Sequence, residues 1–299
     1  MRRWPATPTE MPIVPFAKGP PPLGAIGVGV GVGVGVGSSS AEAMVANVQS
    51  AVNAKIEFFN MMGNWRPSRG GRASFGYARG MSDLVLWANS SWVCPWVFHA
   101  MTALEAKRLP YRLELVPSPM PTATRATLRA RTILATFPIL VHGELWLGES
   151  LAISEYLAET FPAPAHPRLF PADLGVRARA RQIMCWLRTS LAALRDDRPT
   201  TSVFGPIVAT PAPLSPAARA DADELVRVAS ALVQPGATTM FDHWCIADVD
   251  LTVALMRLVR NRDPVPEHLA DYARANWARP SAATYLAHAA VTPRRTETR

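Results

Sequence analysis

Cys94 stands directly before Pro95 in the stretch WVCPWVF, between a short apolar run and a helical pattern. Because proline is tolerated at the first helical position, Cys94 is predicted to be the N-cap of that helix. A helix N-terminus stabilises a nearby anion, and lowering a thiol pKa from ~8.5 to ~6.5 raises its reactive fraction roughly twenty-fold. The thiolate favoured here is either Cys94 itself or a second thiol that faces it. The alternative is a small, buried, apolar filler.

The three cysteines, Cys94, Cys185 and Cys245, are too few and too widely spaced for a disulfide framework or a Cys-x-x-Cys zinc site. No cysteine occupies 95–97, which excludes a dithiol mechanism at Cys94. His243 lies near Cys245 without further ligands at metal spacing, so we expect no metal. This cysteine usage fits a reducing, cytoplasmic compartment best.

The net charge of +8 raises the question of a nucleic-acid partner. Residues 1–80 carry eight Lys or Arg against three Asp or Glu, so more than half of the excess charge lies there. The rest of the chain has acids and bases interspersed, without a basic stripe that alternates with aromatic residues. We therefore expect no nucleic-acid partner. The 299 residues, of which 49% are apolar, suffice for two domains with sizeable cores.

Residues 19–40 contain a Gly-Val dipeptide run, whose glycines raise the entropy cost of ordering and supply nothing to pack. We expect 1–80 to be a disordered, low-complexity extension, with Met81 as the natural start of the protein. A signal peptide is the alternative, because Arg2 and Arg3 precede an apolar run, although several prolines separate them from it. No stretch has the ~18 uninterrupted, strongly apolar residues of a membrane span, and no membrane partner is expected.

The polar and apolar pattern of residues 81–161 predicts a first domain with the element order β-α-β-α-β-β-α. Strands are predicted at 84–88, 111–115, 138–141 and 144–147, and helices from Pro95, at 122–134 and at 149–160. The last two strands read as a hairpin that turns at His142-Gly143. This order, with Pro138 opening the third strand, resembles a thioredoxin fold.

The segment FPILVHGELWLGESLAISEYLAETF, 137–161, resembles the glutathione-binding half of the glutathione S-transferases. The resemblance implies that Phe137 offers its backbone to the cysteine of glutathione and that Pro138 holds a cis peptide bond. It also implies that Glu149 pairs with the γ-glutamyl ammonium, and that Ser150 holds the γ-glutamyl carboxylate. Taken singly, Ser150 reads as a plain N-cap and Glu149 as compensation of the helix dipole.

Beyond a Pro-rich linker at 162–170, strand signals vanish, and 171–290 is predicted to be an all-helical second domain, followed by a tail at 291–299. Helices are predicted at 174–194, 215–233, 246–259, 266–276 and 281–288. The third of these is apolar nearly all round, which is typical of a buried helix. Its entrance reads as a capping box, with Cys245 as the cap, Asp248 as the acid and Trp244 packing on Val249. We interpret Cys245 and Asp248 as structural.

The segments 177–188, 195–204 and 241–259 together resemble the bacterial YfcF-type glutathione S-transferases. The resemblance then covers residues 84–288. Arg177, Arg181 and Arg188 lie near one face of a helix, and a solvated face or a dimer contact is their default interpretation, ahead of a role at the substrate site.

In the transferases, the residue at the position of Cys94 touches the glutathione sulfur. Members with Ser or Tyr there donate a hydrogen bond to the thiolate, whereas members with Cys tend toward disulfide exchange, so the reaction type stays open. We expect an acceptor pocket for bulky electrophiles or hydroperoxides between the domains, lined by Trp92, Trp96, Trp186 and Phe204.

The resemblance implies a homodimeric enzyme that uses glutathione as co-substrate, either in conjugation or in thiol-transferase or peroxidase chemistry. Two other hypotheses stay open: a non-catalytic binding or adaptor protein of the same fold, and a ligand carrier with vestigial activity. The Glu149-Ser150 pair favours the enzyme, because an adaptor has no need of a site for the glutathione carboxylate.

Overall fold

The computed structural model describes residues 83–207 and 210–291. The predicted extension at 1–80, with Met81 after it, and the predicted tail after Val291 lie outside these residues. None of the helices within the described ranges is long and apolar enough to cross a membrane.

Four strands form a mixed sheet: β1 (Leu84–Asn89), β2 (Arg112–Val116), β3 (Ile139–His142) and β4 (Leu145–Gly148). Their order is β2-β1-β3-β4, with β1 parallel to β2 and antiparallel to β3, which pairs antiparallel with β4. Gly143 has a φ of +58° in the β3–β4 turn, a conformation that glycine adopts without steric cost. The β-α-β-α-β-β-α order predicted for the first domain is confirmed.

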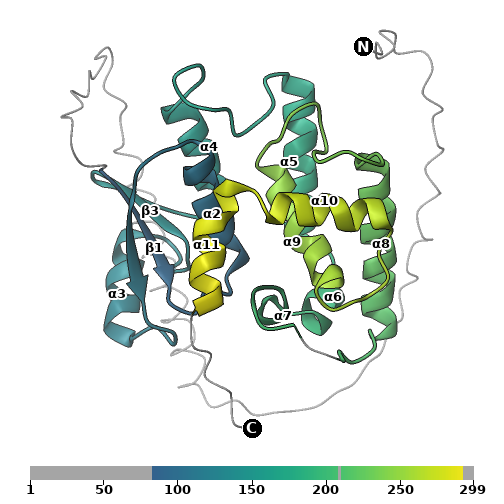
Figure 1. The fold of residues 1–299 in the computed structure, drawn as a ribbon. Coiled ribbons are helices and arrows are strands. Elements are labelled where there is room, and N and C mark those ends of the chain that lie inside the picture. Colours follow the sequence, from purple (N-terminus) through teal and green to yellow (C-terminus); the bar gives the residue numbers. More distant parts are fainter. Residues whose placement is uncertain (1–82, 208–209, 292–299) are drawn as a thin grey trace, which may run out of the picture. The chain divides into compact units, whose positions relative to one another are not determined.

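Three helices complete this domain: α2 (Pro95–Ala106), α3 (Thr122–Arg131) and α4 (Ser150–Thr160). The alternation of β1 buries its even-numbered side chains in the core shared with α2 and α4. The opposite face of the sheet packs Ile139 and Val141 against Leu128 of α3. The sheet thus lies between α3 on one side and α2 with α4 on the other (Figure 1).

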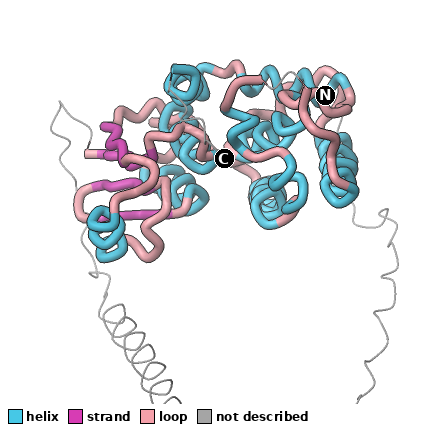
Figure 2. The backbone as a smooth tube through the Cα atoms, turned by 90° about the horizontal axis from the view of Figure 1, so that it is seen from below, coloured by secondary structure: helices cyan, strands magenta, loops and turns pink. Residues whose placement is uncertain are grey.

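The rest of the described chain is helical, as Figure 2 shows by the absence of strands from that part. Its helices are α5 (Leu174–Thr189), α6 (Ala192–Asp197), α7 (Thr200–Phe204), α8 (Pro216–Leu232), α9 (Ala247–Val259), α10 (Glu267–Trp277) and α11 (Pro280–Val291). Helix α9 packs against α5, α7, α8 and α10, and also against α2 of the first domain. Twelve of its thirteen residues are buried, as an all-round apolar helix requires.

The single helix predicted at 174–194 is wrong, because the chain breaks between α5 and α6. Ser190 is extended and Leu191 is left-handed, with a φ of +60°. No glycine or proline marks this break, so local sequence does not reveal it. The kink lets Leu191 and Leu194 both enter the core, which is a tertiary effect. The short helix α7 was not predicted either.

The entrance of α9 has the acid half of the predicted capping box. Asp248 accepts hydrogen bonds from the backbone N–H groups of Cys245 and Met240, both at 2.9 Å, and from the Tyr272 hydroxyl at 2.6 Å. The assigned N-cap is Ile246, and burial raises the pKa of the Cys245 thiol while hydrogen bonds from the backbone N–H groups of Ala247 and Asp248 oppose that rise. Because a thiol is a weak acceptor, the buried carboxylate supplies the stronger hydrogen bonds of this turn.

Candidate active site

Cys94 lies at the start of α2, where its φ of −87° and ψ of 114° and Pro95 at the first helical position fit an N-cap. Its Sγ lies 3.8 Å from the carbonyl oxygen of Phe137, in the loop that leads into β3. The Phe137–Pro138 peptide is cis. The fold therefore brings Cys94 together with Phe137 and Pro138 from 43 residues further along the chain.

Burial raises the pKa of the Cys94 thiol, while the backbone N–H groups of Val97 and Trp96 offset part of that rise. The helix N-terminus is therefore present, as predicted, but desolvation outweighs it for this side chain. A helix N-terminus alone would lower the pKa of the Cys94 thiol, but its environment in the fold raises that pKa. Cys94 is accordingly a protonated thiol at neutral pH.

Helix α11, from the far end of the chain, fixes the loop before Cys94. The Tyr285 hydroxyl donates a hydrogen bond to the carbonyl oxygen of Cys94 at 3.0 Å. Trp92 has a φ of +51°, stacks on His288 with ring centroids 4.2 Å apart, and meets Tyr285 edge to face at 5.3 Å. The position of Cys94 thus depends on contacts that the second domain supplies.

Glu149 and Ser150 differ in how far they reach solvent. Glu149 is exposed and has a φ of +64°, immediately before α4 begins. Ser150 is only 2% exposed, and its hydroxyl accepts a hydrogen bond from Nη1 of Arg188 at 2.9 Å. Glu149 is therefore open to a ligand, whereas the Ser150 hydroxyl is already held from within the protein.

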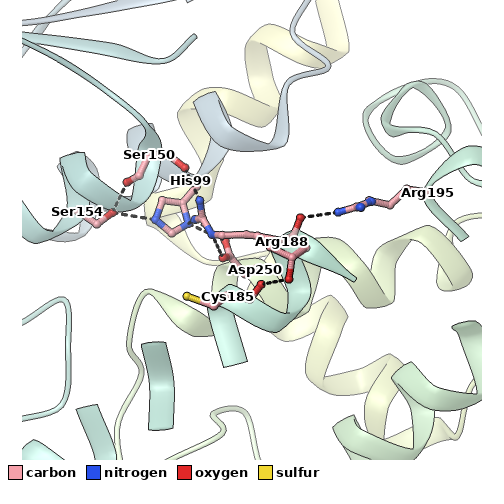
Figure 3. A network of polar contacts seen from close by, with 8 residues as sticks. His99, Ser150, Ser154, Cys185, Arg188, Arg195 and Asp250 are labelled. Carbon is pink, nitrogen blue, oxygen red and sulfur yellow. Dashed lines mark hydrogen bonds and ion pairs between the residues drawn. The ribbon is translucent and has the colours of Figure 1, made fainter. Parts of the chain in front are cut away.

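Arg188 belongs to a buried polar network that joins the two domains (Figure 3). Its guanidinium also pairs with Asp250 of α9, with Nε 2.8 Å from Oδ2. His99 of α2 lies 2.7 Å from Asp250 through Nδ1 and 2.8 Å from the Ser154 hydroxyl through Nε2. The network runs from the start of α4, through α2 and α5, to the central helix α9.

The hydrogen bonds in this network define the state of His99. Desolvation lowers the pKa of His99, although the carboxylate of Asp250 opposes that shift, so the imidazole is neutral. Nδ1–H then donates to Asp250, and Nε2 lies 2.8 Å from the Ser154 hydroxyl, which donates to the carbonyl oxygen of Ser150 at 3.0 Å. Although burial alone would raise the pKa of Asp250, His99 and then Arg188 lower it, so its carboxylate is charged. Asp250 and Arg188 are thus the charged partners of the network.

A cavity opens beside the start of α2. Pro95 and Trp96 line it together with residues of α5, α6, α9 and the kink between α5 and α6: Leu187, Leu191, Leu194, Arg195, Asp250, Val253, Ala254 and Arg257. This is the interdomain position in which the sequence places the acceptor pocket. Its wall is mostly apolar, with three charged residues.

Of the four aromatic residues predicted to line this pocket, only Trp96 does so. Trp92 and Phe204 are 3% and 5% exposed and belong to the aromatic core around Tyr285, so their prediction as pocket residues is wrong. Trp186 is half-buried against the core and does not line the cavity. Trp92, Trp186 and Phe204 all pack against the core. Aromatic residues at helical spacing therefore indicate packing here more often than a pocket.

The three arginines of α5 have different environments. Arg181 forms a bidentate ion pair with Glu155 of α4, and Arg177 donates to the backbone carbonyls of Pro171 and Ala172, just before α5. Only Arg188 departs from the default interpretation, because its side chain is 14% exposed and lies over the Trp96 ring, 4.5 Å from its centroid.

The sequence interpretation missed His99 and Asp250 as partners of Arg188. Asp250 carried a usable signal, since a charged residue inside an apolar helix must be paired when that helix is buried. Nothing in the local sequence marks His99. In the described ranges, no group of three His, Cys, Asp or Glu side chains could hold a metal ion.

The chain has a thioredoxin-like domain, in which a cis-proline lies beside a capping cysteine, followed by an all-helical domain. Both domains match known protein families. Residues 90–165 match the family model "Glutathione S-transferase, N-terminal domain", and residues 173–291 match "Glutathione S-transferase, C-terminal domain". A glutathione transferase homologue from Burkholderia, whose crystal structure has glutathione bound, is 30% identical. It covers 69% of this chain and 98% of its own, with a TM-score of 0.57.

The chain therefore belongs to the glutathione S-transferase family. Among curated proteins, it is similar to glutathione S-transferases T1 and U13 of Arabidopsis thaliana, at 38% and 32% identity over 31% and 30% of this chain. The aligned parts span 37% and 39% of the length of those two plant proteins. A theta-class enzyme from Xanthomonas axonopodis, 23% identical, covers 69% of this chain and 98% of its own, with a TM-score of 0.54, and shows the same fold.

Proposed function

We propose that this protein is a glutathione transferase that conjugates small electrophiles with glutathione at Cys94. The observation that carries the proposal is the meeting of Cys94 Sγ, at the N-terminus of α2, with the Phe137 carbonyl beside the cis-proline at 3.8 Å. An extended thiol peptide that pairs with the backbone of Phe137 places its own sulfur at the same helix N-terminus. A helix N-terminus stabilises a thiolate held there.

The state of Cys94 supports a role as hydrogen-bond donor. Because burial raises its pKa, Cys94 keeps its proton at neutral pH and donates S–H to the thiolate of glutathione. That thiolate then attacks the electrophilic carbon, the leaving group departs with its bonding electron pair, and the thiol proton goes to solvent. The role of the site is to stabilise the thiolate before attack.

The other ends of glutathione have candidate partners near α4. Glu149 is exposed at the start of the helix and would pair with the γ-glutamyl ammonium. The γ-glutamyl carboxylate would lie at the N-terminus of α4, at Ser150. Since the Ser150 hydroxyl already accepts a hydrogen bond from Arg188, the backbone N–H of Ser150 would be the main donor to the carboxylate.

A second candidate reaction is glutathione-dependent reduction of mixed disulfides or hydroperoxides. Cys94 favours it, because a cysteine at this position can form a mixed disulfide that serine cannot. Its raised pKa opposes it, since the thiolate is the nucleophile. The two reactions make opposite demands on Cys94 and are separable by substitution.

The test compares the full chain with its Cys94→Ser and Cys94→Ala variants, assayed with glutathione against an aryl halide and a small mixed disulfide. If Cys94 is a donor, the serine variant retains or gains conjugation and the alanine variant loses it by roughly tenfold. If Cys94 is a nucleophile, both variants lose disulfide reduction. Equal conjugation in all three proteins contradicts a role for Cys94.

The non-catalytic adaptor remains the competing hypothesis for the whole protein. Retention on immobilised glutathione, and its loss in a Glu149→Gln variant, would support the transferase. A chain that passes through such a matrix and conjugates nothing would support the adaptor. Membership of the YfcF-type group, a homodimer and a cytoplasmic location are further proposals, and light scattering at micromolar concentration tests the dimer directly.

A further inference from the structure

The cavity beside Trp96 has two unneutralised positive charges in an otherwise apolar wall. Its charged lining residues are Arg195, Asp250 and Arg257. The charge of Asp250 is offset by its ion pair within the buried network. The two remaining arginines give the cavity wall a net positive charge.

Neither arginine has an acidic partner among the residues that the structure describes. Arg195 donates from Nη1 to the carbonyl oxygen of Arg188 at 2.7 Å, and Figure 3 shows this side chain reaching toward Arg188. Arg257 donates from Nη1 to the carbonyl oxygen of Arg198. A guanidinium carries five N–H donors, so both side chains keep donors for a ligand.

Arg257 is only 7% exposed, and a buried charge without a counter-ion is costly. Burial, and to a smaller extent the positive charge of Arg195, lower the pKa of Arg257 to about 10. The guanidinium nevertheless stays charged at neutral pH. An anion inside the cavity would offset both the desolvation and the repulsion between the two arginines.

We propose that this cavity selects electrophiles that carry a carboxylate on an aromatic or aliphatic body. The apolar wall, with Trp96 on one side, takes the body, while Arg195 and Arg257 take the carboxylate through charge-assisted hydrogen bonds. The inference rests on the proposed function, because the glutathione sulfur is delivered at Cys94, next to Pro95 of the cavity wall.

A matched pair of substrates isolates the carboxylate: 4-chloro-3,5-dinitrobenzoate and its methyl ester. In both, the glutathione thiolate attacks the ring carbon that bears chlorine, the C–S bond forms, and the C–Cl bond breaks. Chloride leaves with the bonding pair, and the thiol proton goes to solvent. The measured quantity is the ratio of kcat/KM for the acid to kcat/KM for the ester.

The variants of the full chain are Arg195→Gln, Arg257→Gln and, as control, Arg219→Gln, which removes the same charge from an exposed position on α8. Loss of a charge-assisted bond to the carboxylate is expected to lower the ratio about tenfold in each cavity variant. The control is expected to keep the wild-type ratio. Should Arg257→Gln fail to fold, Arg195→Gln still decides. A wild-type ratio in the folded cavity variants overturns the proposal.

Binding of unreactive 3,5-dinitrobenzoate, followed by quenching of tryptophan fluorescence, separates this inference from the proposed function. If the wild type conjugates neither substrate but binds dinitrobenzoate with an affinity that falls about tenfold in Arg195→Gln, the anion site stands and the transferase proposal fails. If conjugation proceeds with one ratio in all variants and this binding is unaffected, the transferase stands and the anion site fails.

Discussion

At the scale of single residues, the Tyr285 hydroxyl is a positioning group for the reacting end of α2. Its hydrogen bond to the carbonyl oxygen of Cys94 links α11 to the loop before α2. Tyr285 also contacts the rings of Trp92 and Phe98, so the tyrosine ring is held by packing and its hydroxyl is held in place with it. Removal of the hydroxyl leaves that packing intact.

We therefore expect Tyr285→Phe to lower kcat/KM for conjugation several-fold while it lowers the free energy of unfolding by only about 1 kcal/mol. Steady-state kinetics and urea unfolding measure the two effects on the same preparation. Phe98→Leu is the matched control, because it alters the packing of the same cluster while the backbone N–H of residue 98 keeps its hydrogen bond to the Cys94 carbonyl. A variant with unchanged kcat/KM would show that the loop keeps its position without this hydrogen bond.

At the scale of elements, the entrance of α9 depends on a carboxylate more than on the cap predicted from the sequence. Asp248 accepts three hydrogen bonds, whereas the Cys245 thiol is only a weak acceptor for the backbone N–H groups of Ala247 and Asp248. Burial raises the pKa of Asp248, which shows that desolvation outweighs the donors around it. The donors would be left unsatisfied without the carboxylate, and such groups cost about 1–3 kcal/mol each.

Asp248→Ala is accordingly expected to lower the free energy of unfolding by about 3 kcal/mol or more, whereas Cys245→Ser should change it by less than about 1 kcal/mol. Urea unfolding monitored by circular dichroism compares the two variants. The matched surface change is Asp271→Ala on α10, where the carboxylate is largely exposed and paired only with Arg274. Equal destabilisation by the Cys245 and Asp248 variants would contradict this account.

At the scale of the whole molecule, the network around His99 couples folding to pH, because it packs elements of both domains. The pKa of His99 is lowered from 6.5 by desolvation, so below that pH the unfolded chain binds a proton that the folded chain does not. Folding stability therefore falls as the pH falls through 6.5. Asp250 acts in the same direction at lower pH, since its pKa is lowered from 3.8 and its contribution disappears as it is protonated.

We expect the free energy of unfolding to be lower at pH ~5.5 than at pH ~7.5, by at most about 1.4 kcal/mol per pH unit for one histidine. Urea unfolding at the two pH values measures the difference. A His99→Gln variant should reduce this pH dependence, whereas His243→Gln, at an exposed position, should retain it. If both variants keep the wild-type pH dependence, another group is responsible.

The order of strands and helices, the capping place of Cys94 and the cis form of Phe137–Pro138 agree with expectations from the sequence, because each rests on local patterns and short motifs. The break before Leu191 could not be predicted, since no glycine or proline signals it. The same holds for Trp92 and Phe204, because helical spacing alone does not say whether an aromatic side chain faces a core or a cavity.

By itself, the sequence determined the two-domain organisation of the described chain. It also determined which residues lie at the start of α2 and which lead into β3. Only the tertiary structure decided the charge state of Cys94, because burial depends on what packs over the thiol. Only the structure brought His99, Arg188 and Asp250 together, since they lie on three helices separated by up to 151 residues. Long-range pairing of charges follows from the packing of helices, and no local pattern encodes it.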